Sequence, residues 1–513
     1  MSEQQVSTKG IWKVITASSL GTLIEWYDFY IFGSLAVVIS TKFFPADNPT
    51  AAFLSTLATF AAGFVVRPFG ALFFGRLGDL IGRKYTFMVT LLLMGGATFL
   101  IGCIPSYETI GFFAPLLVLI LRLLQGLALG GEYGGAATYV AEHSPIGQRG
   151  YWTSWIQTTA TFGLFISLMV ILITRGALSE EAFDEWGWRV PFWISIIMVI
   201  VSYFIRKNMH ESPVFAKAKA EGKTSTNPLK ESFGNRLNLK FILLALFGAA
   251  MGQGVVWYTG QFYAMSYLKT VMFVESSQVD GLVGLALLFG TPFFVFFGWL
   301  SDKIGRKVIM MAGMLAAILL YRPIYSKMYT TIDVKNKTEM AENTTLDAVI
   351  KEGKAGKMDS IYTANKVFTD GTVWKQVKTV HLENGVAKMV DGKANVDTKT
   401  TITANPTDRW ALIFLVFIQV IFVTMVYGPI AAFLVEMFPV KIRYTSMSLP
   451  YHVGNGIFGG LLPAISTYFV TNAKDNGDAE FYLEGLWYPI VIAAISFVIG
   501  MVYLKNKNNT SND

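Results

Sequence analysis

The sequence has 513 residues, of which 53% are hydrophobic and 15% are charged, and its mean hydropathy is +0.46. Soluble domains carry about 25% charged residues, so this composition excludes a soluble enzyme and a soluble nucleic-acid-binding protein. The net charge of +7 therefore needs an explanation other than a nucleic-acid partner. The single cysteine, Cys103, rules out an intramolecular disulfide and leaves no Cys/His cluster for a metal.

Apolar segments bounded by charged residues or by Gly and Pro follow one another along the chain. A membrane-spanning helix needs about 20 mostly apolar residues, and each segment is long enough. A polar stretch at 207–238 separates them into two groups of six. We predict an all-α membrane protein with twelve transmembrane helices in two six-helix bundles. The predicted spans are 14–41, 51–75, 85–104, 110–141, 150–174, 187–205, 239–268, 280–300, 308–327, 409–437, 445–470 and 484–504.

A polar insert, residues 328–408, lies between the ninth and tenth predicted spans and contains 11 lysines and 11 acidic residues. It is too polar to cross a bilayer. Polar and apolar residues alternate over 372–382, and the pairs Asn384-Gly385 and Asp391-Gly392 are typical of tight turns. These patterns predict small β-hairpins, and we also expect a short helix at 346–352.

Lys and Arg in the short loops indicate the orientation of the chain. If the amino terminus is cytoplasmic, the cytoplasmic segments hold 21 of these residues and the short loops on the opposite side hold 5. Positively charged loops stay in the cytoplasm, so we predict that both termini are cytoplasmic and that the insert is extracytoplasmic. Membrane topology then accounts for the net positive charge.

An internal repeat relates the two halves of the chain. The segment GRLGDLIGRK at Gly75 recurs as GWLSDKIGRK at Gly298, an offset of 223 residues. The pattern Glu-x-x-Pro-x-x-x-Arg at Glu142 recurs at Glu436, an offset of 294 residues, and the insert accounts for the difference. Both halves therefore have the same membrane orientation. The predicted units are the amino-terminal bundle 1–206, the cytoplasmic loop 207–238, helices seven to nine at 239–327, the insert 328–408, and helices ten to twelve with the tail at 409–513.

Several motifs carry a family resemblance. The repeated loop Gly-x-x-x-Asp-x-x-Gly-Arg-Lys and the pattern Arg122-x-x-Gln125-Gly126 resemble the major facilitator superfamily. The segments GTLIEWYDFY at 21–30, RPFG at 67–70, GEYGG at 131–135 and HESP at 210–213 resemble the metabolite:proton symporters. That group includes alpha-ketoglutarate, citrate, shikimate and proline/betaine permeases. The resemblance implies a multi-pass protein of the bacterial inner membrane that uses protons as the coupling ion and needs no other cofactor; the insert departs from the family pattern.

The resemblance also implies a cytoplasmic gate, in which the repeated loop charges hold helix ends together in the outward-open state. A plainer reading is that these residues only set topology and form turns, but the duplicated spacing favours the gate. The candidate gate residues are Gly75, Asp79, Arg83, Lys84, Glu142, Arg149, Gly298, Asp302, Arg306, Lys307, Glu436 and Arg443.

Five ionisable residues lie inside the predicted spans of the first half, namely Glu25, Asp28, Arg67, Arg122 and Glu132. A charge at mid-membrane costs roughly 2.5 to 3.5 kcal/mol, so each needs a functional or structural reason. At the equivalent positions of the second half, the repeat has uncharged residues for four of them. Coupling chemistry is therefore expected in the amino-terminal half. Those counterparts are Val256, Thr259, Val416 and Val426.

We predict that Glu25, Asp28 and Glu132 carry protons. Burial favours the protonated form of a carboxylic acid and a nearby guanidinium favours the ionised form, so a moving arginine can switch the acid between the two. The alternative is a permanent ion pair of Glu25 or Asp28 with an arginine. Helical periodicity places the polar residues of the fourth span on one stripe that faces one cavity. The stripe comprises Arg122, Gln125, Leu129, Glu132 and Tyr133.

The substrate class is ambiguous between two chemistries. Arginines bind carboxylates through paired hydrogen bonds, whereas a box of aromatic side chains can hold a quaternary ammonium. We predict a small carboxylate, a di- or tricarboxylate metabolite, with a proline/betaine-type osmolyte as the alternative. The candidate substrate-binding residues are Arg67, Arg122, Gln125, Tyr30, Trp257, Tyr258 and Gln419.

These observations predict a secondary active transporter that works by alternating access, functions as a monomer in the lipid bilayer and carries a small-molecule solute with protons. A facilitator without proton coupling is the nearer alternative. A membrane receptor whose insert binds a ligand is an alternative from another class. No enzyme is expected, because the predicted spans show neither a paired nucleophile and base nor a metal-binding set.

Overall fold

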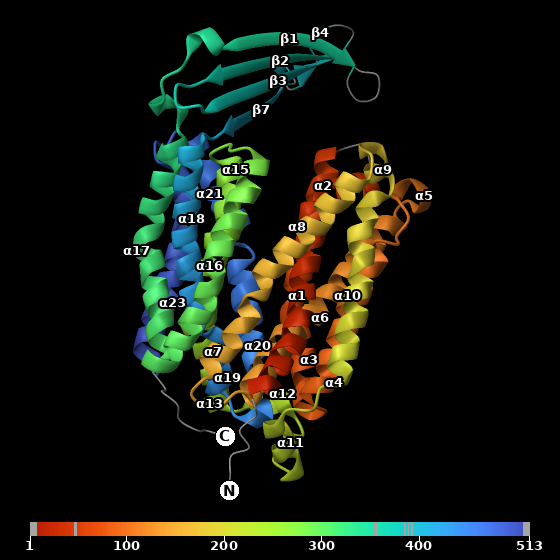
Figure 1. Ribbon diagram of the computed structural model, residues 1–513, viewed down its shortest axis with the longest axis vertical. Helices are drawn as coiled ribbons and strands as arrows, with labels where there is room; N and C mark the ends of the chain where they lie inside the picture. Colours follow the sequence, from red (N-terminus) through yellow and green to blue (C-terminus); the bar gives the residue numbers. More distant parts are fainter. Residues whose placement is uncertain are drawn as a thin grey trace.

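The computed structural model describes residues 8–45, 49–352, 358–383, 386–387, 389–390, 393–394 and 396–505. Two helical bundles stand side by side, and a small β-sheet lies at one end of the second bundle (Figure 1). The bundles meet at the end opposite the sheet, where α1 begins and α23 ends, and they diverge toward the sheet.

The first bundle consists of eight main helices in the described part of the chain. The bent pair α1 and α2 turns through 67° between its helices, and α7 continues into α8 to form another span. The short helices α5 (Tyr107–Ile110), α9 (Glu180–Glu185) and η1 (Gly187–Arg189) lie in connections. The main helices are α1 (Thr8–Ser34), α2 (Ala36–Phe43), α3 (Pro49–Leu80), α4 (Arg83–Ile101), α6 (Phe113–His143), α7 (Arg149–Gln157), α8 (Thr159–Ala177) and α10 (Val190–Lys207).

The second bundle follows two short helices, α11 (Pro213–Ala220) and α12 (Pro228–Gly234). Its first span contains two π-helical turns, and π-helical turns are often found at functional sites. The helices of its first three spans are α13 (Arg236–Ala245), η2 (Leu246–Ala250), α14 (Met251–Tyr258), η3 (Thr259–Tyr263), α15 (Ala264–Thr270), α16 (Ser276–Ile304) and α17 (Arg306–Ile332). The helices of its last three spans are α18 (Pro406–Tyr427), α19 (Ile430–Met437), α20 (Arg443–Val453), η8 (Gly454–Gly459), α21 (Leu462–Asp475), α22 (Phe481–Glu484) and α23 (Trp487–Tyr503).

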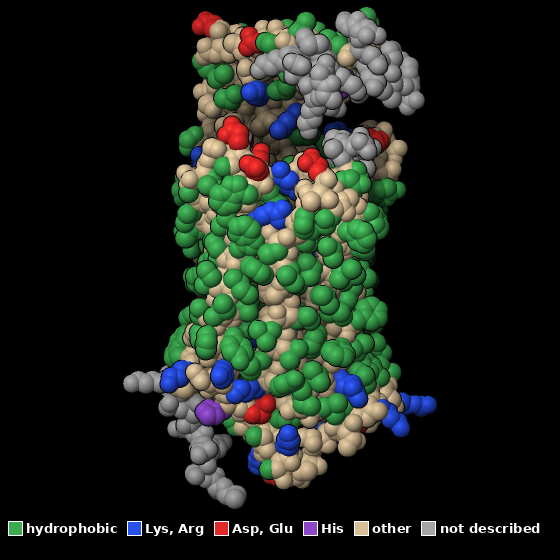
Figure 2. All heavy atoms as spheres, turned by 90° about the vertical axis from the view of Figure 1, so that its right-hand side faces the viewer, with side chains coloured by type: hydrophobic (Ala, Val, Ile, Leu, Met, Phe, Trp, Pro, Cys, Tyr) green, Lys and Arg blue, Asp and Glu red, His purple; other side chains and the backbone are tan. Residues whose placement is uncertain are grey.

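The membrane-spanning character of the bundles is clear from their length and surface. Ten helical segments in the described part of the chain are long and apolar enough to cross a membrane, and the bent pair α1 and α2 makes an eleventh. The 32-residue helix α3 packs along α6 in the first bundle. A broad hydrophobic band covers the surface between belts of charged side chains (Figure 2). The predicted fold class is thereby confirmed.

Close packing of α3 against α6 depends on glycine. A Cβ atom added at Gly126 would lie 2.2 Å from the Gly63 carbonyl oxygen, and one added at Gly130 would lie 2.2 Å from the Arg67 carbonyl oxygen. Small residues let transmembrane helices approach at backbone distance. The two helices are therefore held close at the level where Arg67 and Arg122 enter the bundle.

The insert folds as an antiparallel sheet, which confirms the predicted hairpins. The strands pair in the order β1-β2-β3-β7, and two further short pairs flank the predicted turns at 384–385 and 391–392, which themselves lie outside the described residues. The expected helix at 346–352 is wrong, because this segment pairs with β2 along its whole length. The strands are β1 (Thr345–Glu352), β2 (Met358–Val367), β3 (Val373–Glu383), β4 (Val386–Ala387), β5 (Met389–Val390), β6 (Lys393–Ala394) and β7 (Val396–Thr403).

Backbone and side-chain contacts attach the sheet to the second bundle. Ile402 on β7 donates its N–H to the Phe273 carbonyl over 2.7 Å and accepts from the Glu275 N–H over 3.0 Å. Lys337 forms an ion pair of 2.5 Å with Asp408 in the first turn of α18. Helix α17 extends to Ile332, so the first five residues of the predicted insert, 328–332, are helical.

Candidate functional site

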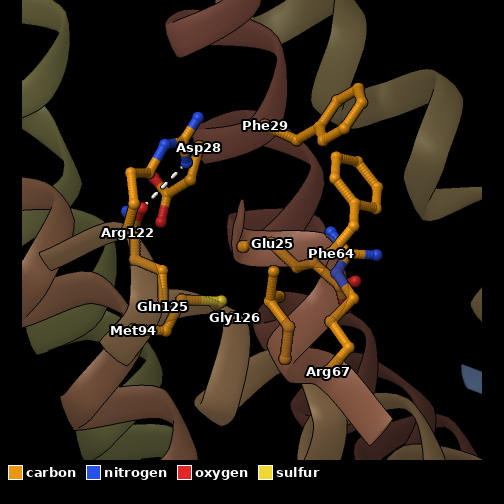
Figure 3. A pocket seen from close by; sticks show the side chains of 11 residues that line it. Glu25, Asp28, Phe29, Phe64, Arg67, Met94, Arg122, Gln125 and Gly126 are labelled. Atoms are coloured by element: carbon orange, nitrogen blue, oxygen red, sulfur yellow. Dashed lines mark hydrogen bonds between the residues drawn. The ribbon is translucent and has the colours of Figure 1, made fainter. Parts of the chain in front are cut away.

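A small cavity in the first bundle brings two of the three predicted acids, Glu25 and Asp28, together with the predicted arginines Arg67 and Arg122. It has a volume of about 20 Å³, which is room for a water molecule and too little for an organic metabolite. Helices α1, α3, α4 and α6 supply the walls (Figure 3). The lining residues are Glu25, Asp28, Phe29, Gly63, Phe64, Arg67, Met94, Arg122, Gln125, Gly126 and Leu129.

Two carboxylates of α1 face this cavity because residues three apart share one face of a helix. Glu25 is 6% exposed, and its Oε2 atom has no hydrogen-bond partner among the described residues. Asp28 is 4% exposed and accepts a hydrogen bond of 2.5 Å from the Thr98 hydroxyl on α4. The Oδ1 atom of Asp28 likewise has no hydrogen-bond partner among the described residues, so each acid has one unsatisfied buried oxygen, and an unsatisfied buried carboxylate is a candidate for holding a proton.

A chain of hydrogen bonds joins Arg122 on α6 to Asp28 on α1. Arg122 Nη1 donates to Gln125 Oε1 over 2.8 Å, and Gln125 Nε2 donates to Thr98 Oγ1 over 2.5 Å. Thr98 in turn donates to Asp28. Bonds in such a chain polarise one another, so a change at the arginine is felt at the acid three side chains away.

The second arginine, Arg67, enters the cavity from α3 on the side away from Arg122 (Figure 3). Its guanidinium carbon lies 4.3 Å from the centre of the Phe64 ring, and that of Arg122 lies 3.5 Å from the centre of the Phe32 ring. Stacking on an aromatic face holds a guanidinium plane in a fixed orientation. Two oriented cations therefore lie on opposite sides of the cavity that Glu25 and Asp28 line.

Glu132 and Tyr133 lie outside the cavity, and the prediction that the whole α6 stripe faces one cavity is wrong. Glu132 shares the helical face of Gln125 but lies seven residues further on, about 10.5 Å along the helix. There it forms an ion pair of 2.5 Å with Arg206 and accepts a hydrogen bond of 2.7 Å from Thr90. Helical periodicity predicts on which face of a helix a residue lies, but it does not predict which cavity that face reaches at each level along the helix axis.

Arg206, one residue beyond the sixth predicted span, is a buried partner that the sequence analysis did not single out. It occupies the last turn of α10, is fully buried and stacks 3.6 Å from the centre of the Phe87 ring. A Cβ atom at Gly21 would collide with both Arg206 and Glu132, at 1.6 and 2.0 Å. The glycine of the α1 motif therefore makes room for this ion pair.

An aromatic layer lies between the two bundles beside the cavity. Trp26 of α1 and Trp257 of α14 approach with ring centroids 5.0 Å apart, and Tyr30 stacks on Phe262 at 6.2 Å. Tyr258 packs edge-on against Trp257 at 4.8 Å. The predicted aromatic candidates Tyr30, Trp257 and Tyr258 are thus brought together, next to the charged cavity.

Gln419 does not join this group. Although the repeat pairs it with Gln125, its amide nitrogen contacts the Met328 sulfur and the Leu415 carbonyl, each at 3.4 Å, inside the second bundle. The neighbours of α18 and α6 differ, so equivalent positions in the repeat have different surroundings.

The second bundle supplies uncharged polar groups that sequence reasoning missed. Gln253 and Asn455 exchange two amide hydrogen bonds of 2.9 and 3.2 Å. Tyr427 and Tyr451 share a hydrogen bond of 2.8 Å between their hydroxyls, and Tyr133 of the first bundle stacks on Tyr451 with ring centroids 3.7 Å apart. The repeat pairs Tyr133 with Tyr427 at the offset of 294 residues, but no pattern in the sequence singles out Gln253, Asn455 or Tyr451.

The repeated loop motifs meet where the two bundles contact each other. In the first copy, Asp79 accepts a hydrogen bond of 2.9 Å from the Thr445 N–H, in the first turn of α20. Arg83 lies 3.1 Å from Asp79 and donates to the Val440 carbonyl over 2.9 Å. Asp79 therefore caps a helix of the opposite bundle, where a carboxylate is stabilised by the helix dipole.

The second copy repeats this contact in the other direction. Asp302 accepts hydrogen bonds of 2.9 and 2.8 Å from the N–H groups of Gly150 and Tyr151 in the first turn of α7. Arg306 bonds Asp302 over 2.8 Å and holds Glu436 through two bonds of 2.7 Å. Each repeated aspartate thus caps a helix of the other bundle.

The remaining gate candidates surround these two caps. Glu142 of the first bundle lies 3.1 Å from Arg443 of the second. Gly75 and Gly298 sit at the bundle contact, where an added Cβ would lie 2.9 Å from Thr445 Cα and 2.4 Å from Ser154 Cβ, respectively. Three basic candidates bind carbonyls within their own halves: Arg149 to Ala141, Lys84 to Lys207, and Lys307 to Met501 and Leu504.

Comparisons with known proteins agree with this architecture. Residues 13–231 match the family model "Sugar (and other) transporter", and residues 137–332 match "MFS/sugar transport protein". The structure of the proton:xylose symporter XylE bound to 6-bromo-6-deoxy-D-glucose superimposes with a TM-score of 0.63 at 15% identity, covering 98% of this chain and 97% of that one. That likeness establishes the fold.

Curated relatives are similar over most of the chain. The Escherichia coli (strain K12) alpha-ketoglutarate permease is 29% identical, with 97% of this chain and 94% of the relative covered. The inner membrane metabolite transport protein YhjE of the same strain is 32% identical, at 90% and 88% coverage. The proline/betaine transporter of that strain is 35% identical over 322 residues, which are 61% of this chain and 64% of the relative.

The fold, its internal repeat and these relatives define a multi-pass membrane transporter of small solutes. The chain belongs to the major facilitator superfamily, among its sugar and metabolite transporters. The members of this family are transporters and not enzymes.

Proposed function

We propose that the protein is a proton-coupled symporter that takes up a small organic carboxylate by alternating access. The observation that carries this proposal is the hydrogen-bond chain from Arg122 through Gln125 and Thr98 to Asp28, beside the buried Glu25 carboxylate. A substrate carboxylate and a transported proton would act on the two ends of one network.

The coupling follows from competition for Arg122. Its Nη1 hydrogen bond to Gln125 keeps the amide oriented toward Thr98, and Thr98 stabilises the Asp28 carboxylate. A substrate carboxylate that draws Arg122 into paired hydrogen bonds disturbs this chain and favours protonation of the acids. Protonation of Glu25 in turn removes a negative charge that would repel the substrate, so binding of substrate and proton reinforce each other.

The closed bundle contact acts as the cytoplasmic gate in this proposal. Asp79 and Asp302 cap helices across the contact, and the bundles diverge toward the sheet. With the predicted topology, this arrangement would be closed toward the cytoplasm, and the substrate would enter from the side of the sheet. Rocking of the bundles would break both caps and release substrate and proton inside.

The sidedness rests on the distribution of Lys and Arg in the loops and has a direct test. Leu346 on β1 is 80% exposed, so a Leu346→Cys variant on a Cys103→Ser background should react with an impermeant maleimide on intact bacterial cells whose outer membrane has been permeabilised. Labelling only after lysis would place the insert, and with it the gate, on the opposite side.

An osmolyte such as betaine or proline is the second candidate substrate. It is favoured by the aromatic layer, in which Trp26, Trp257 and Tyr258 could attract a quaternary ammonium. The relatives support both candidates, since one is an alpha-ketoglutarate permease and another a proline/betaine transporter.

Uptake into proteoliposomes separates these possibilities. With an acidic exterior, radiolabelled alpha-ketoglutarate should accumulate above its external concentration, and a protonophore should abolish the accumulation. Competition by excess citrate with no competition by betaine supports the carboxylate reading. Accumulation of betaine instead would establish the osmolyte hypothesis. Equilibration of the solute without accumulation would indicate a facilitator. No flux of any candidate solute would favour a receptor.

A further inference from the structure

A groove lies between α13 and α23 at the end of the second bundle opposite the sheet. It consists of two adjoining cavities with volumes of about 430 and 370 Å³, which share Lys240, Leu244 and Tyr503 in their walls. Both helices belong to membrane spans, so the groove opens toward the bilayer. It is separate from the charged cavity of the first bundle and from the aromatic layer.

The membrane-facing part of the groove is apolar. Leu243 and Phe247 of α13 are 45% and 36% exposed, and Ile499 of α23 lines the same cavity. Together these side chains form a hydrophobic trough that runs along the two helices into the membrane band. An acyl chain would bury its apolar surface in such a trough, whereas a soluble anion such as phosphate has no apolar surface to bury there.

The rim of the groove is basic. Arg236 and Lys240 in the first turns of α13 and Lys505 after α23 are exposed side chains that line the two cavities. Glu436 is the carboxylate among the lining residues that the structure describes, and Arg306 already holds both of its oxygens at 2.7 Å. The three rim cations therefore present an excess of positive charge next to the trough.

We propose that this groove is a binding site for an anionic phospholipid. The phosphate lies among Arg236, Lys240 and Lys505, and one acyl chain follows Leu243, Phe247 and Ile499. The belt of charged side chains at this end of the bundles marks the depth of the lipid head groups. At this depth each Lys or Arg contributes about 1 kcal/mol to the free energy of binding to anionic lipid. A zwitterionic lipid also carries an ammonium group, which the three cations repel, so its electrostatic attraction to the rim is weaker.

The bound lipid would lie next to the cytoplasmic gate. Arg306 and Lys307 form the inner wall of the groove, where Arg306 bonds Asp302 and Lys307 donates to the Met501 and Leu504 carbonyls at the end of α23. Occupancy of the groove therefore stabilises the second bundle at the gate, whatever solute the protein carries.

Lipid binding to the purified full-length protein tests this proposal by native mass spectrometry in detergent. Phosphatidylglycerol should bind more tightly than phosphatidylcholine of the same chain length. In the Arg236→Gln/Lys240→Gln double variant, phosphatidylglycerol affinity should fall roughly 25-fold, as two lost attractions of about 1 kcal/mol each imply. The matched control is Lys219→Gln on α11, an exposed lysine at the same end of the molecule, which should leave the affinity unchanged.

Two further measurements separate a lipid from a soluble phosphate. Leu243→Gln should weaken binding of long-chain phosphatidylglycerol without affecting inorganic phosphate, and phosphate at millimolar concentration should not displace the lipid. Equal phosphatidylglycerol affinity of the double variant and the unsubstituted protein would overturn the proposal, as would displacement by phosphate alone. If the double variant does not fold, Lys505→Gln, beyond the last helix, provides the same comparison with about a fivefold loss.

Discussion

Thr98 on α4 donates a hydrogen bond of 2.5 Å to Asp28 on α1 and accepts one of 2.5 Å from Gln125 on α6. One hydroxyl therefore connects three helices of the first bundle and links an acid to the arginine chain. A threonine in an apolar span usually donates only to a carbonyl of its own helix. The Met94 carbonyl lies 3.0 Å from Thr98 Oγ1 and competes for its single proton, and the Asp28 carboxylate is the nearer acceptor. The link that Thr98 makes gives the most direct test of the coupling network.

Thr98→Val should uncouple the two ends of this network. The variant keeps the shape of the side chain but removes the donor to Asp28 and the acceptor for Gln125, and hydrogen bonds to charged groups contribute about 1.5 to 3 kcal/mol. We expect kcat/KM for proton-driven uptake to fall about tenfold or more. Thr98→Ser, which keeps the hydroxyl, should retain most activity. Equal uptake by all three proteins would show that the hydroxyl serves helix packing only.

Glu25→Gln and Asp28→Asn test whether the two acids carry the coupled proton. Each variant keeps the size of the side chain and removes its ability to exchange a proton. We expect loss of accumulation driven by a pH gradient, while exchange of labelled for unlabelled solute across the membrane continues. Glu221→Gln, at an exposed loop position, is the control and should behave like the unsubstituted protein. Normal accumulation by both cavity variants would remove the acids from the coupling mechanism.

The crossed caps predict that the gate has two equivalent halves. Removal of a capping carboxylate costs about 0.5 to 2 kcal/mol, so Asp79→Ala and Asp302→Ala should each open the bundle contact several-fold more often. Ser154 is fully buried beside Gly298 at this contact. Labelling of Ser154→Cys, on a Cys103→Ser background, should accelerate in both variants and remain slow in Lys303→Ala, which removes an exposed charge near the same end. Acceleration in only one capping variant would mean that a single copy of the motif closes the gate.

Much of the fold follows from the sequence because length, apolarity and the repeat are direct physical constraints on a membrane protein. The offsets of 223 and 294 residues predict both the two bundles and the place of the insert. The error at 346–352 arose because the segment is short, and pairing with β2 decides its conformation. Tertiary contacts outweigh weak local preferences in such segments.

The candidate site is predicted only in part, for a related reason. Charged residues inside spans are costly, so Glu25, Asp28, Arg67 and Arg122 were identifiable without the structure. Thr98 carries no such cost and gave no signal. Arg206 lies at the end of a span, where an arginine is usually a topology determinant, and its pairing with Glu132 depends on how α10 packs against α6.

The attachment of the sheet should depend on pH through Lys337. Burial acts to lower the pKa of Lys337, but hydrogen bonds and ion pairs with Asp370 and Asp408 together outweigh it and raise that pKa above its usual 10.5. Burial acts to raise the pKa of Asp370, but its interactions with Lys337 and Thr372 outweigh it and hold that pKa below its usual 3.8. The raised lysine pKa adds stability that is complete below about pH 10.5 and is lost as pH rises through the folded pKa. The lowered aspartate pKa adds stability that is complete above about pH 3.8 and is lost as pH falls through the folded pKa.

Hydrogen exchange of β3 and β7 should therefore be constant between about pH 5 and pH 9, after correction for the intrinsic rate, and should accelerate only outside this range. Lys337→Met should increase exchange in these strands within the range. Lys375→Met, on an exposed lysine of β3, is the control. Unchanged exchange in the Lys337 variant would mean that other contacts, such as the backbone hydrogen bonds of Ile402, hold the sheet without the lysine.

Arg122→Lys distinguishes a carboxylate substrate from an osmolyte. Lysine keeps the positive charge but lacks the planar fork that forms two parallel hydrogen bonds with a carboxylate, and it cannot stack on the Phe32 ring as a flat group. It also loses the geometry of the 2.8 Å bond to Gln125. We expect a fall of about tenfold or more in kcat/KM for alpha-ketoglutarate, because loss of one charged hydrogen bond costs about 1.5 to 3 kcal/mol.

Trp257→Ala provides the opposing measurement. Trp257 packs against Trp26 at 5.0 Å and Tyr258 at 4.8 Å, without lining the charged cavity. If the substrate is a carboxylate held by the arginines, this change should lower uptake less than Arg122→Lys does. If the substrate is a quaternary ammonium, the order reverses, because removing the indole face removes the cation–π attraction. Both variants should therefore be assayed with both solutes. A larger loss of uptake in Arg122→Lys assigns the substrate to the carboxylates, and a larger loss in Trp257→Ala assigns it to the quaternary ammonium compounds.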